Sequence, residues 1–319
     1  MFYADQFRIR CSSIHRIMAN MKEPGLTDKE KHELRELEDC RDGKLLTPTG
    51  KVAGFTVKRK ERLAELENER DNPTPVDLPQ GAKTVCEEYV RARCWKRRKG
   101  FTASSTEKGT RTEEDGIELL RQYLDDEFLE KNEERVTTEY IEGESDLNAP
   151  YALIDVKSIE TPFTMPVWKL EPPKVYHDQL QGYGFLYGKE NLWLAYTLNN
   201  APEDMIEREA RIKCRTQYGP DYTYEEYAEI LERTTAQKTY DDLPMALRVR
   251  IIKFKYDPSF IESVIERVKM CRGYISKLES ELPEDVKTEL YYRFKKEGKV
   301  CHFKPYSLIL PETAQSERA

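Results

Sequence analysis

Residues 146–158, DLNAPYALIDVKS, place two aspartates and a lysine around a short apolar run. In a strand, alternate residues share a face, so Asp155 and Lys157 point to one side while Ile154 and Val156 point to the other. The apolar pair suits a core, which leaves a carboxylate and an ammonium group together on the open side of a sheet. Asp146 lies across the preceding turn and is close enough to join them.

These residue types predict a metal site. Two converging carboxylates repel each other unless a positive charge lies between them, and an oxygen-preferring divalent cation is the usual solution. We expect Mg²⁺ at Asp146, Asp155 and the backbone carbonyl of Val156, with Lys157 orienting a bound water or helping to deprotonate it. An isolated D-x-K is more often an ordinary surface ion pair, so the flanking elements must decide.

The helix predicted before these strands carries a further acid. Glu113 lies one turn upstream of an apolar stripe at residues 117, 120 and 124, so its carboxylate should approach the interior that the strands cover. The alternative is a first-turn glutamate that favours the helix dipole.

The helix predicted after the strands carries Gln179, with Tyr176 and Tyr183 at helical spacing. Each of these side chains alone is compatible with plain core or surface. The complete order is much rarer than its parts: an acid-bearing helix, an acid, a D-x-K strand, a Gln-bearing helix and a second strand.

The composition describes a charged chain without a membrane signal. Of 319 residues, 38% are hydrophobic and 35% charged, and the net charge is −7. Since no run approaches the roughly 18 apolar residues of a membrane span and no apolar leader is evident, we expect a cytoplasmic protein without membrane association. Seven scattered cysteines without a CxxC pair indicate buried thiols rather than disulfides, zinc or an iron–sulfur cluster.

Basic residues gather in the first third of the chain. Residues 91–99, RARCWKRRK, hold six cations around a tryptophan. We predict that Arg97, Arg98 and Lys99 neutralise DNA phosphates, although a solvated helix end would have the same sequence.

Periodicity divides the chain into three segments. A helical N-terminal segment with charged insertion is expected over 1–80, the core over 81–202, and a mostly helical extension over 203–319. Within the core, the change from period 3.6 to period 2 predicts strands at 134–143 and 151–159, paired as a hairpin. A helix should follow from 172, then a buried strand at 191–198.

The ordered residues resemble the PD-(D/E)XK nuclease superfamily, and within it the lambda-type phage recombination exonucleases, also called the YqaJ-like viral recombinase family. The resemblance covers roughly 6–20 and 81–202. The family's G…E motif matches Gly109 and Glu113, and its first acid matches Asp146. The remaining matches are the (D/E)XK motif at Asp155, Val156 and Lys157 and the glutamine of the following helix at Gln179.

Two departures from the family pattern are visible. Ser145 stands where the family usually has proline, and the PFT that closely follows the family's lysine comes here only at 162–164. Neither departure removes a metal ligand.

The opening segment IRCSSIHRIM, residues 9–18, is similar to a family segment in which a serine at a helix start and a nearby arginine hold a DNA phosphate. This resemblance implies phosphate binding by Ser12 or Ser13 with Arg8 or Arg10.

The resemblance also implies a fold and an activity. The fold is α/β (α+β), a restriction-endonuclease-like core with a central mixed sheet flanked by helices, plus an N-terminal helical insertion and a C-terminal extension. The activity is Mg²⁺-dependent exonuclease digestion of linear double-stranded DNA from 5′ to 3′ with two ions, Mn²⁺ being the alternative metal. It would leave 3′ overhangs for phage-type recombination.

The implied partners are DNA ends, a single-strand annealing protein and further copies of the chain in a trimeric ring. The alternatives are a sequence- or structure-specific endonuclease of the same superfamily and a non-catalytic scaffold that binds DNA ends.

Overall fold

A computed structural model describes residues 3–19, 26–48, 50–72, 77–97, 108–109, 111–168, 170–298 and 303. The chain forms two compact units, one of Met18–Lys83 and a larger one of Met1–Ile17 with Thr84–Ala319. Across these described ranges, none of the helices is both long enough and apolar enough to cross a membrane.

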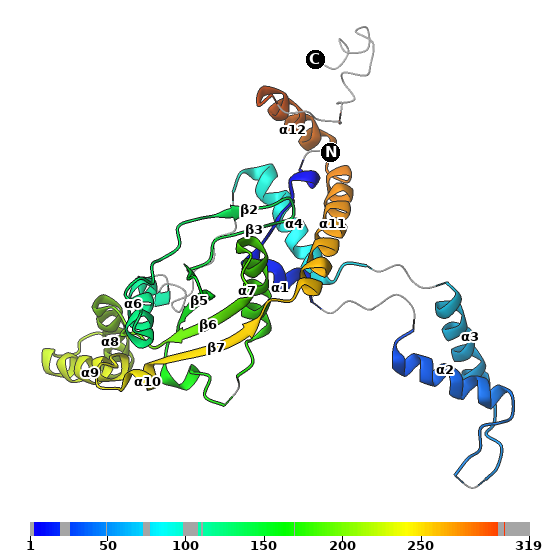
Figure 1. The fold of residues 1–319 in the computed structure, drawn as a ribbon, viewed down its shortest axis with the longest axis horizontal. Helices are drawn as coiled ribbons and strands as arrows, with labels where there is room; N and C mark the ends of the chain where they lie inside the picture. Colours follow the sequence, from blue (N-terminus) through cyan, green and yellow to red (C-terminus); the bar gives the residue numbers. More distant parts are fainter. Residues whose placement is uncertain are drawn as a thin grey trace. The chain divides into compact units, whose positions relative to one another are not determined.

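The elements follow one another as in Figure 1. The helices are η1 (Ala4–Gln6), η2 (Cys11–Ser13), α1 (Ile14–Ile17), α2 (Asp28–Arg41), α3 (Val57–Asp71), α4 (Gln80–Trp95), α6 (Glu113–Leu124), η3 (Pro162–Thr164), α7 (Lys174–Tyr187), α8 (Glu203–Tyr218), α9 (Tyr224–Lys238), α10 (Met245–Arg248), α11 (Pro258–Ser280) and α12 (Glu284–Lys296). The strands are β1 (Ile9–Arg10), β2 (Val136–Thr137), β3 (Ile141–Gly143), β4 (Leu147–Asn148), β5 (Leu153–Ser158), β6 (Asn191–Thr197) and β7 (Val249–Lys255).

The smaller unit is a helical hairpin. Helices α2 and α3 bury four leucines between them, Leu34, Leu37, Leu63 and Leu66.

A mixed four-stranded sheet forms the centre of the larger unit, in the order β4-β5-β6-β7. Strands β5 and β6 are parallel, and β4 and β7 are antiparallel to their neighbours. The predicted central mixed sheet flanked by helices is therefore confirmed. The sheet extends past residue 202, because its last strand is β7.

Helices cover both faces of this sheet. Ile117 and Leu120 of α6 pack with Ile154, Val156 and Ala195 on one face. Helix α7 lies against β5 and β6 on the other face (Figure 1). The expectation that Asp155 faces an open side is wrong: α7 covers that face, and Asp155 is fully buried.

The predicted hairpin between residues 134–143 and 151–159 is also wrong. The first run folds on itself as β2 and β3, and β3 then pairs with β1 of the N-terminal segment. The two-residue strand β4 occupies the edge of β5 instead. The turn between β4 and β5 pairs β4 with the free edge of β5, so that edge is no longer open to β3.

The N-terminal segment packs closely on α7 and β3 at two glycines. A Cβ on Gly182 would lie 2.6 Å from Ile14 Cδ1 and 2.8 Å from Cys11 Sγ, and a Cβ on Gly143 would lie 2.7 Å from Cys11 Sγ. These close approaches fix η2 beside the helix that carries Gln179. The six cysteines in the described ranges, Cys11 among them, are free and buried, as expected.

Candidate active site

Asp146 lies opposite Asp155 at the end of the β4–β5 pairing. The register joins Leu147 to Ile154, so one step further brings the two aspartates across from each other on one face. The Val156 N–H donates to Asp146 Oδ2 at 2.6 Å, which continues the ladder with a side chain. The Val156 carbonyl stays a predicted metal ligand.

Asp155 is held by two neighbours. Its Oδ1 accepts a hydrogen bond from Gln179 Nε2 at 3.1 Å, and the same amide nitrogen donates to the Tyr183 hydroxyl at 3.0 Å. Its Oδ2 lies 2.7 Å from Lys157 Nζ, an ion pair whose angles fall short of a hydrogen bond. A buried carboxylate oxygen thus retains acceptor capacity.

Burial acts in opposite directions on the pKa of Asp146 and on the pKa of Lys157. Burial, together with the charge of Asp155, raises the pKa of Asp146 to about 7. Burial also works to lower the pKa of Lys157, but the carboxylates of Asp155 and Asp146 outweigh it and raise that pKa. Lys157 therefore stays an ammonium ion, which favours orienting a water over deprotonating it.

An aromatic side chain that the sequence predicts only as part of a helical stripe completes the surroundings of Lys157. The Tyr176 ring lies 5.3 Å from Lys157 Nζ, in cation–π range, and meets the Tyr196 ring edge-on at 6.3 Å. The helical spacing of Tyr176, Gln179 and Tyr183 is the sequence signal that could have placed Tyr176 and Tyr183 in the site.

Glu113 comes from the helix on the opposite face of the sheet. Its Oε1 forms an ion pair with Lys131 Nζ at 2.8 Å. Its charge contributes to the raised pKa of Asp146, so the two carboxylates sense each other. Sequence analysis missed Lys131, which bridges to Leu147 beside Asp146. Within the described part of the chain, no group of three His, Cys, Asp or Glu side chains is arranged to hold a metal ion.

The donors at the aspartate pair nevertheless suit a divalent cation. Two carboxylates face each other, a buried oxygen of Asp155 lacks a hydrogen bond, and burial together with the charge of Asp155 raises the pKa of Asp146. Oxygen ligands of this kind are those that Mg²⁺ prefers. The residues therefore fit the predicted metal.

The predicted phosphate-binding residues lie in the N-terminal segment, with Arg8 before β1, Arg10 in β1, and Ser12 and Ser13 in η2. Arg8 Nε donates to the Thr138 carbonyl at 2.8 Å, and Arg10 Nε pairs with Glu142 Oε1 at 3.3 Å. Ser12 is exposed and Ser13 is half-buried. In the described ranges, no hydrogen bond or ion pair joins these four residues to Asp146 or Asp155.

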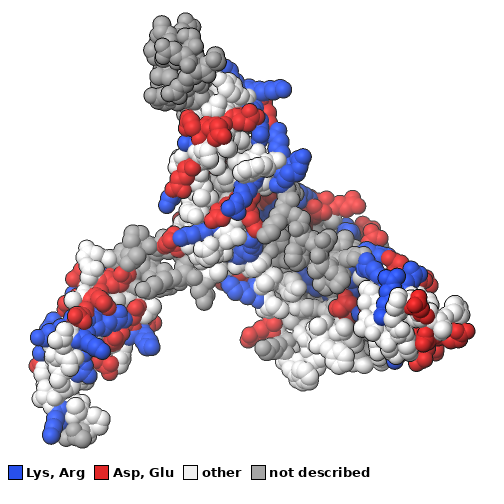
Figure 2. Space-filling view, turned by 180° about the vertical axis from the view of Figure 1, so that it is seen from behind, with Lys and Arg blue, Asp and Glu red and all other residues white. Residues whose placement is uncertain are grey.

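The second predicted DNA contact is only partly described. Arg97 is exposed and donates to the Lys96 carbonyl at 3.0 Å, while Arg98 and Lys99 lie outside the described residues. On the face drawn in Figure 2, basic and acidic side chains intermingle, so the face carries both signs of charge.

Comparison with known proteins identifies the fold. No family model matches the chain, and no curated protein sequence does. The crystal structure of a phage related exonuclease from Haemophilus somnus 129PT is similar, with a TM-score of 0.53 and 20% identity over 87% of this chain and 97% of that one. This chain shares the fold of that exonuclease. The restriction-endonuclease-like core expected from the sequence is thereby confirmed.

Two weaker likenesses are to an alkaline exonuclease, LHK-Exo, from Laribacter hongkongensis. Its structure has a TM-score of 0.42 and 11% identity over 93% of this chain and 96% of that one. The complex of LHK-Exo with dAMP has a TM-score of 0.38 and 13% identity over 69% and 87%.

Proposed function

We propose that the chain is a metal-dependent exonuclease that hydrolyses phosphodiester bonds of linear double-stranded DNA. The observation that carries the proposal is the facing pair Asp146 and Asp155, with Lys157 and Gln179 bound to Asp155. The fold shared with a phage related exonuclease supports it.

Each residue has a separate role in the proposed reaction. A divalent cation held by Asp146 and Asp155 would polarise the phosphoryl oxygen and lower the pKa of a bound water. Gln179 fixes Asp155 from α7, and the Val156 N–H fixes Asp146 from β5. Lys157 remains cationic, so it can orient the attacking water and offset charge that develops on the phosphate.

Finer features of the proposal come from the family resemblance. They are Mg²⁺ as the metal with Mn²⁺ as an alternative, a second ion bound through Glu113, 5′ to 3′ direction and 3′ overhangs for recombination. The same proposal includes contacts to the DNA backbone at residues 97–99, an annealing partner, a trimeric ring and a cytoplasmic location. It also includes phosphate contacts at Ser12, Ser13, Arg8 and Arg10.

The experiment compares degradation of linear duplex DNA by the wild type, Lys157→Ala and Lys269→Ala, with Mg²⁺ and with EDTA. Lys269 is a matched control, because it is an exposed lysine paired with Glu266. We expect Lys157→Ala to lower the rate by about 10²–10⁴-fold, EDTA to abolish it and Lys269→Ala to leave it unchanged. Degradation that persists in Lys157→Ala, or without any divalent metal, contradicts the mechanism.

Two substrates test the finer features. Covalently closed circular DNA should stay intact, and its cleavage would indicate an endonuclease instead. Duplexes with a 5′-phosphate should be digested faster than duplexes with a 5′-hydroxyl, and equal rates contradict the phosphate contacts proposed for Ser12 and its neighbours.

A further inference from the structure

The loop that joins β5 to α7 exposes an unusual amount of apolar surface. Phe163 is 97% exposed and Trp168 is 92% exposed. Five of the seventeen large hydrophobic side chains exposed in the described chain fall between residues 163 and 175. Clustered apolar exposure of this kind marks a binding surface more often than scattered single residues do.

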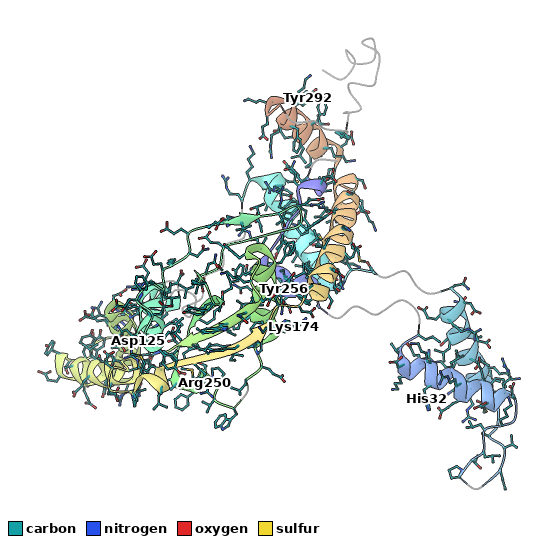
Figure 3. All side chains as sticks on the ribbon, viewed as in Figure 1. His32, Asp125, Lys174, Arg250, Tyr256 and Tyr292 are labelled. Atoms are coloured by element: carbon teal, nitrogen blue, oxygen red, sulfur yellow. The ribbon has the colours of Figure 1, made fainter. Side chains whose placement is uncertain are left out.

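The part of the loop around Phe163 is a hydrogen-bonded turn, so a regular backbone presents this ring. The η3 turn is closed by Met165 N–H donating to the Pro162 carbonyl at 3.1 Å, and the Thr164 hydroxyl donates to the Thr161 carbonyl at 2.8 Å. Further along, Arg250 Nη2 lies 3.5 Å from the Val167 carbonyl. Figure 1 shows the loop extending outward past β7, and Figure 3 labels Arg250 on that strand.

Both ends of the loop lie at the nuclease site. It leaves β5 just after Lys157 and returns through α7 just before Tyr176, and these two side chains contact each other at 5.3 Å. Phe163 is six residues from Lys157, so it lies no more than about 20 Å away, which is about six nucleotides at the roughly 3.4 Å rise of B-DNA.

The sheet register places the far side of the loop equally near. Lys157 pairs with Tyr196 and Tyr196 with Arg250, so the three form one row across β5, β6 and β7. With about 4.8 Å between strands, Arg250 is about 10 Å from the Lys157 backbone. Trp168 follows Val167, which Arg250 contacts.

The aromatic side chains lie in a stretch of the loop without acids. Residues 161–170, TPFTMPVWKL, include one lysine and no acid, and they are flanked by Glu160, which pairs with Lys238 at 2.9 Å, and by Glu171. Lys174 at the start of α7 adds a cation whose side chain is 56% exposed, although it pairs with the buried Asp178 at 3.1 Å. Exposed aromatic rings are the groups on which unpaired bases stack.

We propose that Phe163 and Trp168 form a stacking surface for unpaired bases of the DNA beside the nuclease site. The inference rests on the proposed nuclease function and deepens it. An enzyme that hydrolyses one strand of a duplex must hold the terminal bases apart, and stacking on these rings stabilises the opened end.

The experiment uses Phe163→Ala/Trp168→Ala and, as matched control, Phe128→Ala, since Phe128 is 91% exposed and follows α6 rather than belonging to the loop. Each protein is given blunt linear duplexes and duplexes whose ends carry several mismatched, unpaired nucleotides. The double variant should digest blunt ends at least about fivefold more slowly, with a smaller loss on the pre-opened ends. The control should match the wild type on both substrates. Equal losses on the two substrates, or no loss, overturn the inference.

A binding measurement separates this inference from the proposed function. Oligothymidylate should quench the tryptophan fluorescence of the wild type and much less that of Trp168→Phe, whether or not the protein cleaves DNA. Absence of quenching overturns the stacking surface, whereas quenching without cleavage by the wild type overturns only the nuclease. Sedimentation completes the test, because a change of oligomeric state in the double variant would assign the loop to contacts between copies of the chain instead.

Discussion

Replacement of Asp146 by asparagine should stabilise the metal-free protein, and the gain should depend on pH. The amide oxygen introduced by Asp146→Asn can still accept the Val156 N–H, so the substitution removes charge and keeps the hydrogen bond. The pKa of Asp146 is raised from 3.8 to about 7 in the folded protein. Its carboxyl therefore contributes stability that is fully present below about pH 4 and is lost as pH rises through 7.

The magnitude follows from the same shift. About three pKa units at 1.36 kcal/mol each give a limit of about 4 kcal/mol, of which about 2.5 kcal/mol falls between pH 5 and pH 8. Asp146→Asn should then gain about 2.5 kcal/mol more in unfolding free energy at pH 8 than at pH 5. Mg²⁺ at pH 8 should stabilise the wild type and not the variant, because a bound cation favours the charged carboxylate.

The assay is urea unfolding in EDTA at the two pH values. Asp115→Asn is the control, because Asp115 is an exposed carboxylate on α6, the helix that also carries Glu113. The control should change stability equally at both values. A gain for Asp146→Asn that does not vary with pH would refute the account in which burial and the charge of Asp155 raise the pKa of Asp146.

Three further changes test the positioning of the site and the packing that supports it. Gln179→Leu should lower activity by about 10- to 100-fold, measured as the initial rate of duplex digestion, because Asp155 Oδ1 loses its amide donor; an unchanged rate contradicts this role. Tyr176→Leu should slow the reaction and Tyr176→Phe should restore it, since only an aromatic ring keeps the cation–π contact with Lys157; equal rates for the two variants would exclude that contact. Gly182→Ala should lower the free energy of unfolding, measured in urea, by about 1–3 kcal/mol, because its new Cβ meets Ile14 and Cys11. Gly273→Ala in α11 is the control: its Cβ meets nothing within 4 Å, so the free energy of unfolding should rise by about 0.5–1 kcal/mol.

Local patterns in the sequence predict the site well where it is built from one strand. Alternation along β5 places Asp155 and Lys157 together, and their 2.7 Å ion pair agrees with that prediction. Alternation cannot say which face stays open, because that depends on the helix that covers the strand from elsewhere in the chain. Asp155 is buried because α7 packs over it.

The misassigned hairpin has a similar cause. Strand β4 has only two residues, too few to show a period of 2, so the longer run before it is the more obvious partner for β5. Sequence patterns also could not predict the ion pair of Glu113 with Lys131, since Lys131 is eighteen residues away and belongs to no periodic element. Contacts between separate elements, rather than local preferences, account for these differences.

The attachment of the N-terminal segment to α11 sets an order of events during protein synthesis. Arg267 and Arg272 of α11 donate to the carbonyls of Ile17 and Phe7, so these two carbonyls find their partners only after about 250 more residues have been added. At roughly 5–20 residues per second this delay is between about 10 and 50 s. Cys11 and Ile14 pack on α7 and β3 without help from α11, so a nascent chain truncated before α11 should already hold the segment with Ser12 and lack only the bonds at Phe7 and Ile17.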